Sequence, residues 1–152
     1  MTLTASIVCN SIEGLTLTKA FTVTVAASQE SQATLREQLQ AKLAAGFAAY
    51  GGLRDAVTGE PLEERDGKYI AANDIHFPNT RDFGVDGKYT PVIITSSDAD
   101  TIVPPGVNNA ARVEVYRPLP GEDAKDVTVT VTIKDKETGI AVSRDFVIAV
   151  QP

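Results

Sequence analysis

Hydrophobic and polar positions alternate most regularly near the C-terminal end of the chain, from Asp126 to Val150. Valine and isoleucine at 127, 129, 131 and 133 alternate with threonine at 128, 130 and 132. After the polar segment 134–139, the alternation resumes at Ile140 and runs to Val150. A period of two in β-branched residues is typical of a half-buried antiparallel strand pair, and Gly139 supplies the positive φ that such a turn usually requires. This segment predicts a β-hairpin with one apolar face.

A second version of the same pattern lies at the N-terminal end. Residues 2–7 align with residues 128–133 at an offset of 126, and residues 14–25 align with residues 139–150 at an offset of 125. Phe21 then falls on Phe146, and Lys19 on Arg144. Because self-similarity at a fixed spacing indicates repeated modules, we predict that residues 1–27 are the C-terminal hairpin of a preceding module. Residues 28–152 would form one further module.

Three segments follow one another in a characteristic order along this module. Ile93–Asp98 reads as a strand followed by Ser-Ser-Asp, Val115–Pro118 reads Val-Tyr-Arg-Pro, and the C-terminal hairpin comes last. With the copy at residues 2–25, this order resembles bacterial immunoglobulin-like modules, particularly the atrophied bacterial Ig-like domains. The resemblance implies an Ig-like β-sandwich. The family usually carries a tryptophan on the strand before Ser-Ser-Asp, whereas this chain has none.

Between the two hairpins, residues 28–50 predict a single α-helix. Ser28 or Ser31 can cap its first turn, apolar side chains recur every four residues at 35, 39, 43 and 47, and Gly51-Gly52 would end it. Packing against a core is the expected role of this stripe. The expected fold class is therefore mostly β, an Ig-like antiparallel β-sandwich from residues 53–152 with one N-terminal α-helix. Its inward positions would be Val127, Val129, Val131, Phe146, Ile148 and Val150.

Two acidic segments offer oxygen ligands that a calcium ion could use, residues 60–66 and the pair Asp98 and Asp100. The first lacks the alternating Asp-x-Asp-x-Asp-Gly spacing of a known calcium-binding loop. We expect a solvated connection over residues 53–67 and an Asx-type turn at 98–100. Cys9 is the sole cysteine, so neither an intrachain disulfide nor a cysteine zinc cluster can form. We therefore expect no metal site, and folding that requires no metal or organic cofactor.

Candidate catalytic residues are scarce. His76 is the sole histidine, and Asp74 would share its face of a strand, an arrangement that is more often structural than catalytic. The chain carries no nucleophile-elbow motif, no phosphate-binding glycine loop and no second histidine for a triad. We expect no enzymatic activity and assign no catalytic residue.

The net charge of −6 argues against nucleic acid or anionic membrane as a partner. No apolar run approaches the length of about 20 residues that a spanning helix needs, so no membrane insertion is expected. The resemblance implies a non-catalytic structural, spacer or adhesive module in a tandem-repeat bacterial protein. Such proteins are secreted or displayed at the cell surface, with the signal and anchor outside these residues. Its partners would be neighbouring modules of the same polypeptide and, at the cell surface, protein or glycan ligands.

The alternative is a carbohydrate-binding accessory module of a secreted glycoside hydrolase. Sugar sites usually need exposed aromatic side chains, because an aromatic ring stacks on the apolar face of a pyranose. With no tryptophan, the candidates for such a platform are Tyr69, Tyr89 and Tyr116.

The N-terminal hairpin has an apolar face that is too large to leave in water, and an isolated two-stranded hairpin is marginally stable. Either it docks on its own chain's module, or it lends its strands to a neighbouring chain in a strand-exchanged dimer through residues 2–25. We favour the second outcome, because the helix separates this hairpin from its own sheet.

Overall fold

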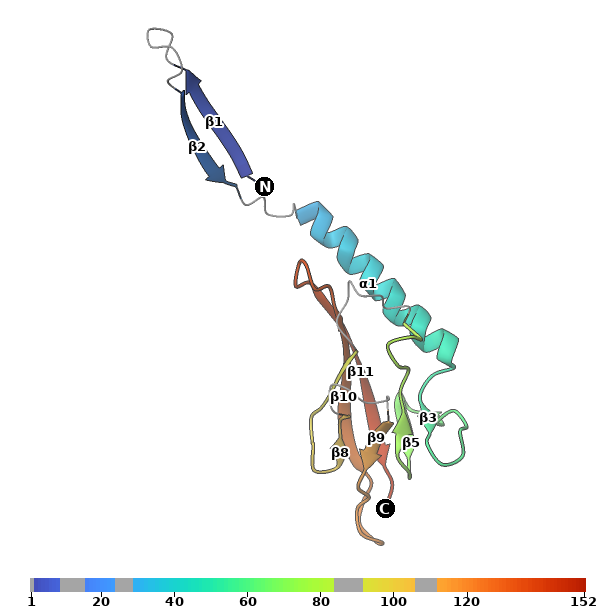
Figure 1. Cartoon of the computed structure of the whole chain (residues 1–152). Helices are drawn as coiled ribbons and strands as arrows, with labels where there is room; N and C mark the ends of the chain where they lie inside the picture. Colours follow the sequence, from blue (N-terminus) through green and yellow to red (C-terminus); the bar gives the residue numbers. More distant parts are fainter. Residues whose placement is uncertain (1, 9–15, 24–28, 84–91, 106–111) are drawn as a thin grey trace. The chain divides into compact units, whose positions relative to one another are not determined.

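The computed structural model describes residues 2–8, 16–23, 29–83, 92–105 and 112–152 (Figure 1). The chain divides into two compact units, Met1–Gln32 and Ala33–Pro152. The division falls within the first turn of helix α1 (Gln29–Tyr50), a few residues after the module boundary drawn from the sequence at 27/28. The two units are described separately.

The first unit contains a two-stranded antiparallel sheet of β1 (Thr2–Val8) and β2 (Thr16–Thr22). The predicted hairpin is therefore confirmed over its strands, while its turn, with Cys9, lies outside the described residues. Leu3 pairs with Phe21 and Ile7 pairs with Leu17. Since side chains alternate between faces along a strand, these apolar positions share one face, and the threonine positions of both strands share the other.

The pairing register of this hairpin reproduces the sequence repeat. In the second unit, β10 (Lys125–Lys134) and β11 (Ala141–Val150) are antiparallel neighbours that pair Val129 with Phe146. Under the offsets of 126 and 125, the pair Leu3–Phe21 maps onto this pair. The other pairs between β1 and β2 likewise map onto pairs between β10 and β11. The two hairpins are thus alike in strand register as well as in sequence.

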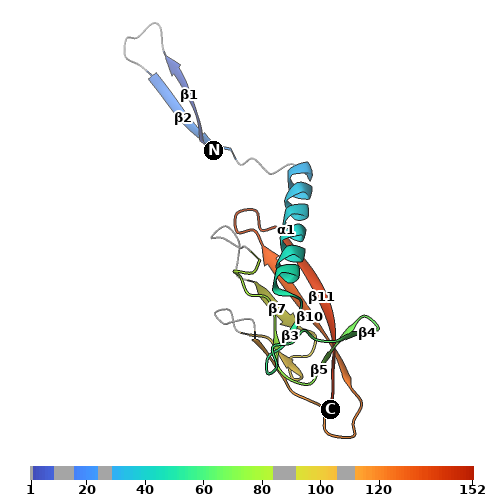
Figure 2. The ribbon, with the colours of Figure 1, turned by 90° about the vertical axis from the view of Figure 1, so that its right-hand side faces the viewer.

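Strands β10 and β11 lie at the centre of a five-stranded sheet with the order β4-β5-β11-β10-β7 (Figure 2). The others are β4 (Glu64–Arg65), β5 (Lys68–Ala71) and β7 (Ile93–Ser96). β7 is antiparallel to β10, but β5 is parallel to β11. The expectation of a purely antiparallel sheet is wrong at this pair. Parallel neighbours need a long crossover connection, and here the chain between β5 and β11 contributes β6, β8 and β9 to the second sheet before it returns.

The second sheet has four short strands in the order β3-β6-β9-β8, and all its pairs are antiparallel. They are β3 (Arg54–Asp55), β6 (Ile75–His76), β8 (Ile102–Val103) and β9 (Arg112–Val115). The segment 53–67 is mostly exposed, as expected for a connection. It nevertheless contributes β3 and β4, which its polar composition did not predict.

Helix α1 packs through the predicted stripe, because Leu39, Leu43 and Phe47 are buried. Gly51 and Gly52 end it with φ values of 81° and 86°, and both amides donate to the Phe47 carbonyl oxygen. This is the left-handed C-terminal geometry that glycine favours. The predicted cap Ser28 lies outside the described residues.

One hydrophobic cluster joins residues of the helix and of both sheets. From the second sheet it takes Ile75, Ile102 and Val113. All six inward positions predicted for β10 and β11 are buried: Val127, Val129, Val131, Phe146, Ile148 and Val150. The protein is therefore mostly β, with one helix and two main sheets that share a core.

Candidate functional site: an aromatic pocket between the helix and the first sheet

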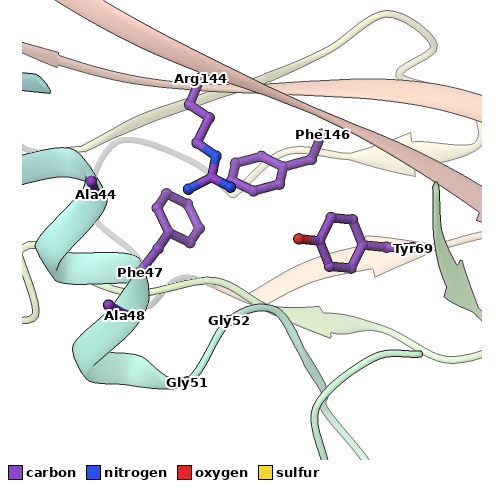
Figure 3. A pocket seen from close by; sticks show the side chains of 8 residues that line it. All are labelled: Ala44, Phe47, Ala48, Gly51, Gly52, Tyr69, Arg144 and Phe146. Atoms are coloured by element: carbon purple, nitrogen blue, oxygen red, sulfur yellow. The ribbon is translucent and has the colours of Figure 1, made fainter. Parts of the chain in front are cut away.

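A pocket of about 300 Å³ lies between the C-terminal end of α1 and strands β5 and β11 (Figure 3). It combines small residues of the helix end, three aromatic rings and one cation. The lining residues are Ala44, Phe47, Ala48, Gly51, Gly52, Tyr69, Arg144 and Phe146.

The floor of the pocket is an aromatic cluster built by segments that are far apart in the sequence. Phe146 occupies an inward position of β11, and its ring centroid lies 4.6 Å from that of Phe47 on α1. Tyr69 of β5 and Phe77 place their ring centroids 5.8 Å and 6.1 Å from that of Phe146. These tilted and edge-to-face arrangements suit the ring quadrupoles and stabilise the contact beyond the area that it buries. The cluster packs the helix against the five-stranded sheet.

Phe83 extends this cluster on the helix side, and a glycine makes room for it. Its ring lies 5.4 Å from that of Phe47, in an edge-to-face contact. A Cβ added at Gly46 would lie 2.1 Å from Cδ1 of Phe83. Glycine weakens a helix interior, so its presence in α1 is explained by this close approach.

Arg144 lies over the cluster from the side of β11 (Figure 3). Its guanidinium carbon is 4.9 Å from the ring centroid of Phe146 and 5.4 Å from that of Phe47, which is cation–π geometry. Arg144 pairs with Val131 across the hairpin, so it stands on the inward face of the sheet. Among the described residues, no carboxylate lies within ion-pair distance of it. The guanidinium is held by the rings beneath it.

The Tyr69 hydroxyl turns toward the same space (Figure 3). Burial and then the negative charge of Glu64 raise the pKa of Tyr69, while the positive charge of Arg144 acts in the opposite direction. A side-chain hydrogen bond with Glu64 raises this pKa further, so the phenol is neutral at physiological pH and its hydroxyl is engaged by Glu64. Arg144 is the polar group of the pocket that could hold one small anionic group over an apolar floor.

The geometry of this pocket does not suit stacking on a sugar. Phe146 is 3% exposed and Phe47 is 5% exposed, and the guanidinium of Arg144 covers both rings. A carbohydrate platform needs an open ring face. Of the three candidate tyrosines, only Tyr69 lines the pocket. Tyr116 is 57% exposed and is not among the lining residues, and Tyr89 lies outside the described residues.

Asp98 caps its own turn, as the sequence predicted. Its Oδ1 accepts from the amides of Asp100 and Thr101, and its Oδ2 accepts from Thr101 Oγ1 at 2.9 Å and forms an ion pair with Lys125 Nζ at 2.5 Å. The hydrogen bond from Lys125, followed by that from Thr101, lowers the pKa of Asp98 to about 2. The carboxylate is fully engaged in joining the turn to the start of β10.

The acidic segment 60–66 carries one exposed ion pair between near neighbours. Glu63, within the segment 60–66, forms an ion pair with Arg65 at 2.7 Å. Over the part of the chain that the structure describes, no group of three or more histidine, cysteine, aspartate or glutamate residues could hold a metal ion.

Asp74 and His76 belong to the pairing of β6 with β9. Asp74 Oδ2 accepts from Arg112 Nη2 at 2.7 Å, and its Oδ1 accepts from the Val115 amide at 2.9 Å. Burial by itself would raise the pKa of Asp74, but the Val115 amide and Arg112 outweigh it, so the pKa is lowered. His76 pairs with Arg54 and Arg112 in the strand register. The geometry gives Asp74 a structural role in joining strands.

Sequence reasoning did not single out Arg144 or the contact between Gly46 and Phe83. One signal for Arg144 was present, because the repeat places Lys19 and Phe21 where Arg144 and Phe146 stand. In the first unit, Lys19 Nζ lies 5.3 Å from the ring centroid of Phe21. A cation next to a phenylalanine ring thus occurs in both hairpins, which indicates that this contact belongs to the structure of the repeated hairpin.

Comparison of the chain with known protein families, curated proteins and solved structures gave no match. In the described ranges, no helix is both long enough and apolar enough to cross a membrane.

Proposed function

We propose that this chain is a non-catalytic structural module of the Ig-like β-sandwich type from a tandem-repeat bacterial surface or secreted protein. It acts by spacing and stiffening its neighbours, and carries out no reaction. The observation that carries this proposal is the shared register of the two hairpins. A second closing hairpin in one chain is what a tandem array would contain.

The chemistry of the described residues supports the proposal. Asp74 and Asp98, which were candidates for chemistry, each join one part of the fold to another. The guanidinium of Arg144 covers the aromatic cluster. Two sheets that share one core agree with a sandwich, in which both inner faces are buried against each other.

Domain organisation follows from the same argument. Residues 1–27 are proposed to be the closing hairpin of a preceding module, and residues 28–152 the next module. The helix then begins the second module and covers one part of its core through Leu39, Leu43 and Phe47.

Amide hydrogen exchange tests the structural role. A module that keeps its neighbours at a set distance must not open locally, so the central amides of β10 and β11 should exchange only through global unfolding. Their exchange free energies should match the free energy of unfolding from urea denaturation. Central β10 amides that exchange several kcal/mol more easily than global unfolding allows would contradict a stiffening role.

A carbohydrate-binding role is the second candidate, because Tyr69 and Arg144 share a pocket. A glycan array separates it from the first. We expect no saturable binding by the wild-type chain. Binding that is lost in Arg144→Gln or Tyr69→Ala, and kept in the control Tyr50→Ala, would replace the structural proposal with this one.

A further inference from the structure

The hairpin of β1 and β2 forms a sheet of two strands only, so within the described part of the chain no third strand pairs with either of its edges. The matching hairpin of β10 and β11 has neighbours on both sides. β7 pairs along Val129–Thr132, and β5 pairs along Ile148–Val150. Helix α1 adds Phe47 against Phe146. We call β5, β7 and the helix residues 33–50 the cradle of the closing hairpin.

The offsets of 126 and 125 identify which residues of β1 and β2 would contact such a cradle. The residues equivalent to Val129–Thr132 are Leu3–Ser6, which would pair with a strand like β7. Phe21 is equivalent to Phe146, which touches rings from the helix and from β5. In this chain, Phe21 is 45% exposed and Phe146 is 3% exposed. The first hairpin therefore carries the features that a cradle engages, and its phenylalanine is not enclosed.

The apolar sets of the two hairpins are also nearly equal in volume. Leu3 is one carbon larger than Val129, and Leu17 is one carbon larger than Val142. Ala5 is two carbons smaller than Val131, and Val23 is one carbon smaller than Ile148. Cores tolerate several simultaneous hydrophobic substitutions when total volume and pattern are kept. A cradle that accepts β10 and β11 would thus have room for β1 and β2.

A dimer formed by two such hairpins face to face is a weaker solution. Strands of this length give a face about 23 Å long and about 10 Å wide, hence on the order of 230 Å². Stable protein interfaces bury about 800 Å² per partner. A cradle instead covers one face and both edges of the hairpin, so it satisfies backbone groups that the face-to-face dimer leaves open.

We propose that β1 and β2 are the closing hairpin for the cradle of another module of this kind, which has no other closing hairpin. Leu3–Ser6 pair antiparallel with that module's counterpart of β7, and Phe21 enters its counterpart of the aromatic cluster. The cradle of this chain is already filled by β10 and β11, which pair over ten residues each. The inference rests on the proposed repeat organisation and adds the surface through which one module completes another.

The test is a graft within the full chain. Residues 1–25 replace residues 127–150, so Met1 follows Asp126 and Val25 precedes Gln151. Cys9→Ser is introduced in every copy of the segment. We expect the graft to unfold cooperatively, with a Tm lower than wild type by on the order of 10 °C.

A control graft omits Met1, so that Thr2 follows Asp126. The shift by one residue turns the first strand over and points its threonines at the core. We expect no cooperative transition in this control. Failure of the in-register graft to fold, or equal stability of the two grafts, would overturn the proposal.

A disulfide reports the register directly. In the graft, Thr4 takes the place of Thr130, which pairs with Thr95. Opposite residues of an antiparallel pair have Cα atoms about 4.5–5.5 Å apart, which is within disulfide range. In the in-register graft, the pair Thr4→Cys and Thr95→Cys should oxidise readily. The pair Thr4→Cys and Ile93→Cys in the same graft should not. The reverse result would overturn the proposed pairing.

Light scattering on the ungrafted chain measures its oligomeric state and tests the alternative partner, the same hairpin of a second copy of this chain. A wild-type dimer that becomes a monomer in Phe21→Asp, together with a graft that does not fold, would assign the hairpin to a second hairpin. These outcomes are distinct from failure of the structural function, which the glycan array and hydrogen exchange decide.

Discussion

The two hairpins of this chain share their alternation, their register and a cation next to a phenylalanine, yet they differ in what surrounds them. Phe146 is 3% exposed and Phe21 is 45% exposed. The first contacts rings from three other segments, and the second has Lys19 beside it. The comparison teaches that alternation is sufficient to specify a hairpin and its register. Burial of the apolar face depends on segments distant in the sequence.

The largest expected contrast is between the two phenylalanines. Phe146→Ala should lower the free energy of unfolding by about 3–5 kcal/mol, because it removes a buried ring from a closed cluster. Phe21→Ala should change the same quantity by less than about 1 kcal/mol, as expected for an exposed side chain. Urea denaturation of both variants measures the difference. Equal losses would show that Phe21 is also part of a packed core, and the comparison would break.

The next contrast concerns the helix that covers Phe146. Gly46→Ala in a helix would ordinarily stabilise the protein by up to about 1 kcal/mol. Here the added Cβ meets the buried ring of Phe83, so we expect a net loss of about 1–3 kcal/mol, as in other overpacked cores.

A double-mutant cycle with Phe83→Leu isolates this contact. In the Phe83→Leu background, Gly46→Ala should lose much less stability than in wild type. The same large loss in both backgrounds would mean that the ring is not the cause.

A smaller difference in stability is expected between substitutions of Arg144 and of Lys19. Arg144→Met should lower the free energy of unfolding by about 0.5–1 kcal/mol, since the guanidinium interacts with two rings and covers them. Lys19→Met should have no measurable effect on the same transition. Because the contact does not involve a carboxylate, the Arg144→Met loss should persist at high salt. A loss that disappears in 1 M salt would point to an ion pair instead.

The smallest effect belongs to Asp98, which ties the turn after β7 to the start of β10 and has no counterpart in the first hairpin. Its folded pKa of about 2 lies below the usual value of 3.8. A lowered pKa contributes stability above the usual value, and this contribution is lost as the pH falls from about 4 toward 2. Asp98→Asn should therefore be less stable than wild type at pH 7, with the difference narrowing through that window.

Thermal melts between pH 2 and pH 7 measure this narrowing. Asp100→Asn is a matched control from the same turn. A difference between wild type and Asp98→Asn that stays constant across the window would contradict the role given to the carboxylate.

Local patterns carried the sequence predictions that the structure confirms. The alternation at 127–150 predicted both long strands and their buried positions, because a period of two assigns side chains to faces. The spacing of four in residues 35–47 predicted the packed face of α1, and the glycine pair predicted its end. Asp98 was correctly placed in a turn, since its partners Asp100 and Thr101 are close in sequence. The offsets of 126 and 125 predicted a second hairpin of the same kind at residues 2–25.

Contacts between distant segments were decided only by the tertiary structure. The parallel pairing of β5 with β11 could not be predicted, because strands of two to four residues carry little periodicity and their neighbours are chosen by the shared core. The meeting of Phe47, Tyr69, Phe83 and Phe146 is of the same kind, as is the space that Gly46 leaves. Sequence by itself determined the helix, the long strands of the two hairpins and the face that each of their side chains takes, because these are properties of neighbouring residues. Only the packed chain decided which faces meet, because that depends on the shape and volume of segments far apart in sequence.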